Sequence, residues 1–184
     1  MHAISKLLAC AVASAIAAAA VAQNQVTSAY SPLTDAACSA KVDDSTTGAQ
    51  TMECPGVHGY RLRVTEDDER SSVDVVTPDG RSFALNFWDV VTRGFSTLGS
   101  HAEWRSKVVN GTAIPFAVIV GVNALDQRDP DNPHPLPLLA VARISRDEVC
   151  VTHRIDAAHP GATSRARIAA AQALAPCLRD TAKP

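Results

Sequence analysis

Alternation between apolar and polar residues runs through the middle of this chain and restricts the folds that are open to it. From Tyr60 to Trp88 apolar side chains recur at every second position, the periodicity of a β-strand with one buried face. An acidic turn at 66–69 and Pro78-Asp79-Gly80 interrupt the run, and in the second turn proline presets φ while glycine accepts a positive φ. This pattern predicts antiparallel hairpins, with Arg63 about opposite Asp74.

The second half of the chain continues the strand pattern and adds a candidate central strand. Asn110-Gly111 is the strongest short hairpin signal in the sequence. The segment that follows, 113–122, is apolar on both faces, so we expect a central strand that is covered on both sides. A last hairpin is expected between 138 and 155, across Arg146-Asp147-Glu148.

The periodicity changes to that of a helix near the C-terminus. From Thr163 to Leu178 the apolar residues follow helical spacing, and either Thr163 or Ser164 would be the N-cap. The expected fold class is therefore α+β: a single β-rich domain of six or seven mostly antiparallel strands, with a C-terminal helix packed on the sheet. The buried stripe of that helix would consist of Ile168, Ala171, Leu174, Ala175 and Leu178.

The first twenty-two residues have the composition of a secretory signal peptide. Lys6 supplies the positive n-region, Leu7–Ala19 is an apolar h-region, and Ala20-Val21-Ala22 ends in the small-x-small pattern of a cleavage site. We expect cleavage after Ala22 and a periplasmic or secreted bacterial protein without a membrane span, because a span needs about 18 to 20 apolar residues. A retained transmembrane helix and lipidation of Cys10 are the alternatives.

Four of the five cysteines follow the leader, an even number in a compartment that permits disulfides. Three pairings are possible. We favour Cys38 with Cys54 and Cys150 with Cys177, because each pair is close in sequence and encloses one local unit. No Cys-x-x-Cys spacing supports a redox role for these thiols.

Composition divides the mature chain into an arm and one globular domain. Residues 23–53 contain Ser, Thr, Ala and Asp with few large apolar groups, so we expect a low-complexity N-terminal arm there and a β-rich domain at 54–184. In the full sequence Lys and Arg number 17 against 19 Asp and Glu, without a basic stripe, which excludes nucleic-acid binding. The sequence leaves the oligomeric state open.

Catalytic motifs are weak in this sequence. The histidines are scattered, and the acidic turn at 66–69 lacks the glycine and the oxygen spacing of a calcium loop, so no metal or cofactor is expected. The alternative to a non-catalytic protein is an exported hydrolase whose site is assembled around Ser100, His101 and Glu103, with Asp89.

A charged, proline-rich loop is the best candidate for a contact surface. Residues 126–137 contain four charged residues, one histidine and four prolines, which neither a helix nor a strand interior tolerates well. Loops on rigid sheets often carry binding, so the leading interpretation is a disulfide-stabilised accessory or binding module for a protein or cell-envelope ligand. The candidate contact residues are Asp126, Arg128, Asp129, Asp131 and His134.

Several short sequence motifs between residues 53 and 105 resemble those of a set of small exported proteobacterial proteins of unknown function. They include Glu53-Cys54-Pro55-Gly56, Gly59-Tyr60 and Ala102-Glu103-Trp104-Arg105. The resemblance implies an exported β-rich domain. It implies no activity, cofactor or site residue.

Overall fold

The structure is a computed structural model that describes residues 25–179 of the 184-residue chain. The expected signal peptide, its cleavage site and Cys10 lie outside the described residues. Within these residues the chain forms ten strands and two helices. The strands are β1 Val26–Pro32, β2 Val42–Asp43, β3 Gln50–Pro55, β4 Arg61–Asp67, β5 Arg70–Val76, β6 Ser82–Ala84, β7 Ser96–Val109, β8 Thr112–Asp126, β9 His134–Ile144 and β10 Val149–Asp156; the helices are α1 Phe87–Val90 and α2 Ala162–Ala170.

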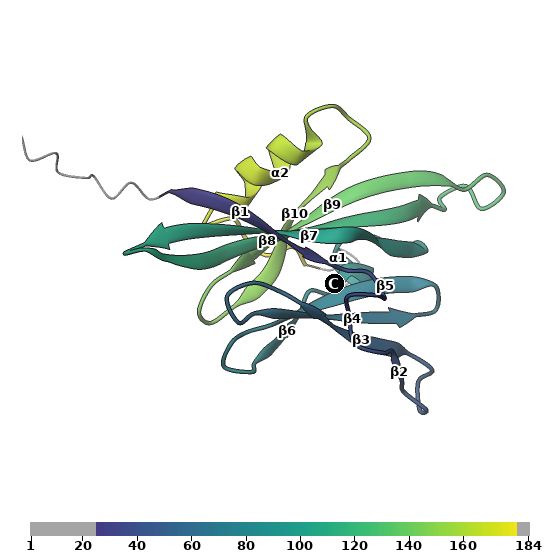
Figure 1. Cartoon of the computed structure of the whole chain (residues 1–184). Helices are drawn as coiled ribbons and strands as arrows, with labels where there is room; N and C mark the ends of the chain where they lie inside the picture. Colours follow the sequence, from purple (N-terminus) through teal and green to yellow (C-terminus); the bar gives the residue numbers. More distant parts are fainter. Residues whose placement is uncertain (1–24, 180–184) are drawn as a thin grey trace, which may run out of the picture.

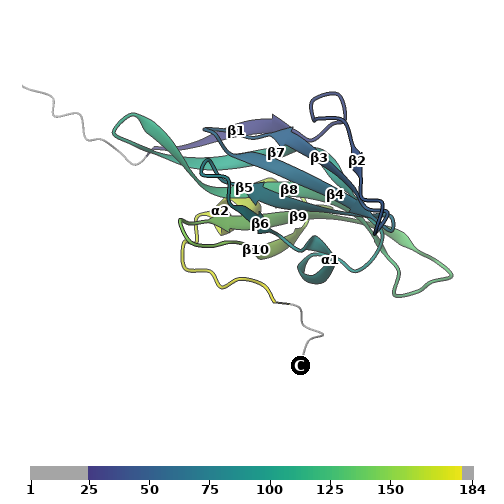
Figure 2. The same ribbon diagram turned by 90° about the horizontal axis from the view of Figure 1, so that it is seen from below.

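All ten strands belong to one sheet that folds over on itself. The strand order is β10-β9-β8-β7-β5-β4-β3-β2, with β1 added to β7 and β6 added to β5. Every pairing is antiparallel except that of β5 with β7, which is parallel and rests on the single pair Arg70 and Ser96. At this junction the sheet bends, so β2–β6 form one layer and β1 with β7–β10 form the other, with α2 outside the second layer (Figures 1 and 2).

The β-rich class and the C-terminal helix are confirmed, but the expected number of six or seven strands is too low. Part of the difference comes from the segment expected to be an arm. β1 pairs along its whole length with β7, from Val26 opposite Lys107 to Pro32 opposite His101, and β3 pairs with β4. The polar composition of β1 suits an edge strand, which needs only one buried face and takes its partner from far along the chain.

Local turn chemistry is where the sequence was most informative. Asn110 and Gly111 both have positive φ, 50° and 77°, and join β7 to β8 as expected. Gly80 has φ 85° in the turn after β5. In the β4–β5 ladder Arg63 stands opposite Asp74, as the alternation predicted, although its Nε donates to Glu53 on β3 at 2.8 Å.

The strand that is apolar on both faces is central, as expected. β8 lies between β7 and β9, and its residues Val118, Val120 and Val122 contribute to the main core between the two layers. Its alternate residues Ala117 and Ile119 contribute to a second core beneath α2. The main core also contains the fully buried side chains of Trp104, Phe87, Leu62, Val64, Val73 and Val75.

Helix α2 is shorter than expected and buries a different face. It follows Gly161, whose φ is 77°, and it packs on the sheet through Ala162, Ala166, Ala169 and Ala170. Alanine side chains permit the helix to approach the sheet closely. The expected anchors Ile168 and Leu174 are instead 66% and 94% exposed.

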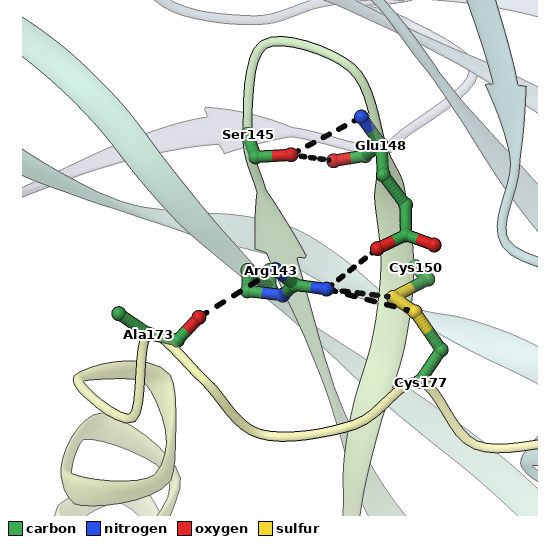
Figure 3. A network of polar contacts seen from close by, with 6 residues as sticks. All are labelled: Arg143, Ser145, Glu148, Cys150, Ala173 and Cys177. Atoms are coloured by element: carbon green, nitrogen blue, oxygen red, sulfur yellow. Dashed lines mark hydrogen bonds and ion pairs between the residues drawn. A yellow bond between two sulfur atoms is a disulfide. The ribbon is translucent and has the colours of Figure 1, made fainter.

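The chain leaves the helical path after α2 because its tail is tied to β10. Both favoured disulfides are present, Cys38–Cys54 and Cys150–Cys177. The second one holds the tail beside β10, where the backbone N–H of Leu178 donates to the carbonyl of Val151 at 2.7 Å. Figure 3 shows Arg143 beside this bridge, with its Nη2 3.9 Å and 3.7 Å from the two sulfur atoms and 2.6 Å from a carboxylate oxygen of Glu148.

Within residues 25–179 no helix has both the length and the apolar character required to cross a bilayer.

Candidate functional site

The loop expected to make contacts connects β8 to β9 and projects beyond the strands (Figure 1). It is shorter than the expected 126–137, because the strands stay paired as far as Asp126 and His134 and leave 127–133 as the connection. The prolines at 135 and 137 are accommodated in β9 because β10 pairs with β9 only from Leu138 onward.

Asp126 anchors the base of this loop. Its carboxylate is almost fully buried and accepts hydrogen bonds from Nε of Arg128 at 2.9 and 3.0 Å and from the backbone N–H of Arg128 at 3.1 Å. Nε2 of His134 lies 3.6 Å from the same carboxylate. The bonds from Arg128, side chain first and backbone second, lower the pKa of Asp126 to about 2. The first turn of the loop is therefore held by an ionised carboxylate.

The other two predicted contact residues, Asp129 and Asp131, lie at the tip of the loop. The carboxylate of Asp129 accepts a bond from the backbone N–H of Asp131 at 3.3 Å, and its carbonyl accepts one from the N–H of Asn132 at 3.1 Å. Asp129 and Asp131 are exposed. They define the turn at the tip and take no part in the anchor.

A cleft of about 610 Å³ opens beside the anchored base of the loop, and we call it the loop cleft. The segment formed by α1 and the residues after it provides one wall, and the ends of β8 and β9 provide the other. Its lining combines apolar with charged side chains. It is lined by Asp89, Val91, Thr92, Arg93, Gly94, Leu125, Asp126, Gln127, Arg128, Leu136, Leu138 and Arg154.

The two walls are joined by close backbone contacts. A Cβ at Gly94 would lie 2.3 Å from the carbonyl oxygen of Leu125, so only glycine permits the chain to pass here. The amide oxygen of Gln127 accepts a bond from the backbone N–H of Phe95 at 3.0 Å. The cleft is therefore a feature of a rigid junction.

Three arginines and two aspartates line the loop cleft. Arg128 is engaged with Asp126, and Nη1 of Arg154 donates to the carbonyl of Val91 at 3.4 Å. Arg93, Arg154 and Asp89 are exposed. With two carboxylates against three guanidinium groups, the lining carries a net charge of +1.

The residues of the alternative hydrolase are not gathered in one cavity. Oγ of Ser100 lies 2.8 Å from Nδ1 of His101, and both side chains are exposed. Glu103 is only 6% exposed, and Asp89 lines the loop cleft. Ser100, His101 and Glu103 are absent from the lining of the loop cleft and of two other clefts in the described part of the chain.

Glu103 instead joins three elements. Its Oε1 accepts bonds from Oγ of Ser28 on β1 at 2.6 Å and from Nε of Arg167 on α2 at 2.8 Å, and Nη1 of Arg105 lies 3.5 Å away. Nη2 of Arg167 also donates to the hydroxyl of Tyr30 at 2.8 Å. Through these partners the carboxylate connects α2 with β7 and β1. The side chain of Arg167 points toward the sheet.

Potential metal ligands gather at one place in the described residues. Side-chain atoms of Glu148, Cys150 and Cys177 lie within 4.8 Å of one another. Both cysteines form the second disulfide, so their sulfur atoms are not thiolate ligands.

The α1 side of the loop cleft was not anticipated from the sequence. Asp89, Arg93 and Arg154 come from segments that are distant from the loop in sequence, and no motif connects them. The available signal was the irregular stretch around Gly94, which breaks the strand pattern where the close contact with Leu125 occurs. No family of known proteins, curated protein sequence or solved structure matches this chain.

Proposed function

We propose that this protein is an exported binding module without catalytic activity, and that its protein or cell-envelope ligand is bound at the loop cleft. Two disulfides suit a protein that works in an oxidising compartment outside the cytoplasm. The leader-like sequence and the resemblance to small exported proteobacterial proteins support the same location.

The observation that carries the proposal is the anchored loop beside a preformed cleft. Because Asp126 is bound by the side chain and backbone of Arg128, the base of the loop needs little ordering when a ligand binds. Leu125, Leu136 and Leu138 provide an apolar surface within the cleft. Small and peptide ligands bind in clefts of this kind, where an apolar wall is combined with a few polar groups.

The charge of the lining indicates which ligands suit the cleft. The lining carries a net charge of +1 and Arg154 is exposed there, so an anionic group next to an apolar one complements it better than a cationic group does. A peptide segment with an acidic residue beside an aliphatic one has this chemistry.

Site-specific photo-cross-linking in the cells that produce the protein tests the proposal. A photoreactive amino acid replaces Asp89 or Leu136 in the cleft, and replaces Asp147 in the exposed β9–β10 turn as the matched control. We expect one discrete adduct from positions 89 and 136 that is absent from position 147. Equal labelling at all three positions, or no adduct at any of them, would contradict the proposal.

A further inference from the structure

The N-terminal strand β1 is an open edge of the sheet. It pairs with β7 alone, from Val26 opposite Lys107 to Pro32 opposite His101. On its other side no strand of residues 25–179 is paired with it, and Figure 2 shows β1 at the margin of the molecule. We call residues 26–32 the β1 edge. It is separate from the proposed function, because none of its residues lines the loop cleft.

The register with β7 determines which backbone groups of β1 point outward. The carbonyl of Gln25 accepts a bond from the N–H of Val108 at 2.9 Å. At the other end, the N–H of Leu33 donates to the carbonyl of Ser100 at 2.9 Å. Since the ladder between these two bonds has no register shift, the odd-numbered residues face β7, and the even-numbered ones direct N–H and C=O away from it. The outward groups are those of Val26, Ser28 and Tyr30, with a C=O alone from Pro32.

The β1 edge lacks the protection that the other ends of the sheet have. Native proteins protect edge strands with short length, charged residues, prolines, bulges or a covering segment. β2 has only two residues, and β10 is covered by the tail of the chain, where the N–H of Leu178 donates to the carbonyl of Val151. β1 has seven residues, no charge and no bulge, and its single proline stands at the last position. The strand is therefore open to pairing with another chain.

The side chains that accompany the outward groups are exposed. Val26 is 42% exposed and Tyr30 is 57% exposed, and Ser28 is exposed between them. They share the face of the sheet that carries α2, because the hydroxyl of Tyr30 accepts a bond from Arg167 and side chains alternate along a strand. An aromatic and a β-branched side chain are thus available for contacts with a strand added beyond β1.

The β1 edge is complementary to itself. Two copies in antiparallel orientation about a twofold axis at Ser28 place Ser28 opposite Ser28, and Val26 opposite Tyr30 of the second copy. Every outward N–H and C=O of these three residues then has a partner. Pairs of an aromatic with a β-branched residue are favourable across strands, and no like charges meet because β1 has no charged residue. Pro32 lacks an N–H, so the ladder ends there.

We propose that two copies of this protein associate through their β1 edges, antiparallel about a twofold axis at Ser28. The layer formed by β1 and β7–β10 of one copy then continues into the same layer of the second copy. A single pair of strands is a small interface, below the range of about 1,200 to 2,000 Å² that is typical of stable complexes. We expect a reversible dimer with a dissociation constant on the order of 10 to 100 µM.

Sedimentation velocity and amide hydrogen exchange of the purified protein test the proposal. Sedimentation should show a change from monomer to dimer between about 1 µM and about 1 mM. Exchange is read at single residues by fragmentation in the mass spectrometer, at protein concentrations below and above the measured dissociation constant. The amides of 27, 29 and 31 bond to β7 and should be protected at both concentrations. Those of 26, 28 and 30 should become protected only in the dimer.

Two double variants test the register. Val26→Glu with Tyr30→Glu places like charges opposite each other across the axis and should weaken association about tenfold or more. Within one copy these carboxylates lie near Lys107 and Arg167, so the fold should be retained. Val26→Glu with Tyr30→Lys places opposite charges across the axis and should restore association to within about threefold of the wild type.

The matched control introduces two glutamates at exposed apolar residues outside the β1 edge. Val42 on β2 and Ile168 on α2 are 64% and 66% exposed, and Val42→Glu with Ile168→Glu should leave association unchanged. Circular dichroism confirms that each variant folds.

Three outcomes would overturn the proposal. A protein that stays monomeric up to about 1 mM would leave the β1 edge to an extended segment of a different protein. A dimer in which the amides of 26, 28 and 30 still exchange freely would associate through another surface. Equal association of the two double variants would exclude the pairing of Val26 with Tyr30. The wild-type exchange pattern decides the first two outcomes without any variant.

Discussion

The indole Nε1 of Trp104 on β7 donates a hydrogen bond of 2.9 Å to Oγ of Ser31 on β1, and both residues are buried. The Trp104 ring also lies 5.8 Å from that of Tyr60, centroid to centroid. The bond joins the N-terminal strand to the largest side chain of the core. β1 is therefore an integral part of the domain.

Ser31→Ala should lower the free energy of unfolding by about 1 to 2 kcal/mol, because the indole N–H would stay buried without an acceptor. Urea denaturation followed by far-UV circular dichroism measures the change. Ser45→Ala, in an exposed turn, is the control and should change stability by less than about 0.5 kcal/mol. Equal effects of the two substitutions would mean that the buried bond contributes nothing.

The ion pair between Glu103 and Arg167 should help to hold α2 on the sheet. Arg167→Gln leaves the buried carboxylate of Glu103 with weaker partners and should lower the free energy of unfolding by about 1 to 3 kcal/mol. This is less than for a fully buried pair, because water screens the exposed part of Arg167. Glu103→Gln and the double variant complete a double-mutant cycle. A coupling energy near zero by urea denaturation would show that the helix is held by its alanine face alone.

Acid should weaken the anchor of the β8–β9 loop. The pKa of Asp126 is lowered to about 2 in the folded protein, below its ordinary value of 3.8, so ionisation stabilises the folded state above about pH 4. That contribution is lost as the pH falls through the range from about 4 to about 2. The stability difference between the wild type and Asp126→Asn should therefore shrink over this range. A difference that stays constant between about pH 5 and about pH 2 would contradict this prediction.

Arg143 should make the Cys150–Cys177 bridge easier to reduce. Its guanidinium lies 3.7 Å from Sγ of Cys177, and a nearby cation stabilises the thiolate that leaves when a dithiol attacks. Arg143→Gln should slow reduction of this bridge by dithiothreitol. Quenching with an alkylating agent and peptide mass spectrometry follow both bridges at once. Cys38–Cys54 is the internal control, and an equal change at both bridges would contradict the explanation.

The loop anchor and the hydrolase alternative show what sequence reasoning supplies about a site. The prolines and charges of 126–137 predict a loop because they are local features, and the structure places Asp126, Arg128 and His134 together at its base. Ser100, His101 and Glu103 are close in sequence, which does not bring their side chains together. Glu103 in fact faces Ser28 and Arg167, which approach it only through tertiary structure.

The sequence by itself determined the features that depend on neighbouring residues. Glycine and asparagine placed the turns because few other residues accept a positive φ, and period-two alternation defined most strands from β4 onward. The short spacing of the cysteines favoured the two pairings that form. The two apolar faces of β8 predicted its central position, because a strand of that kind must be covered on both sides.

Tertiary structure decided what depends on partners far apart in the chain. β1 has too few apolar residues to be recognised alone, and its pairing with β7 makes it a strand. The tail after α2 follows Cys150 and β10 rather than its own helical periodicity, because a covalent bridge and an edge hydrogen bond outweigh helix propensity. The loop cleft forms between segments distant in sequence, so its charge and shape became visible only once the sheet had folded over at Arg70 and Ser96.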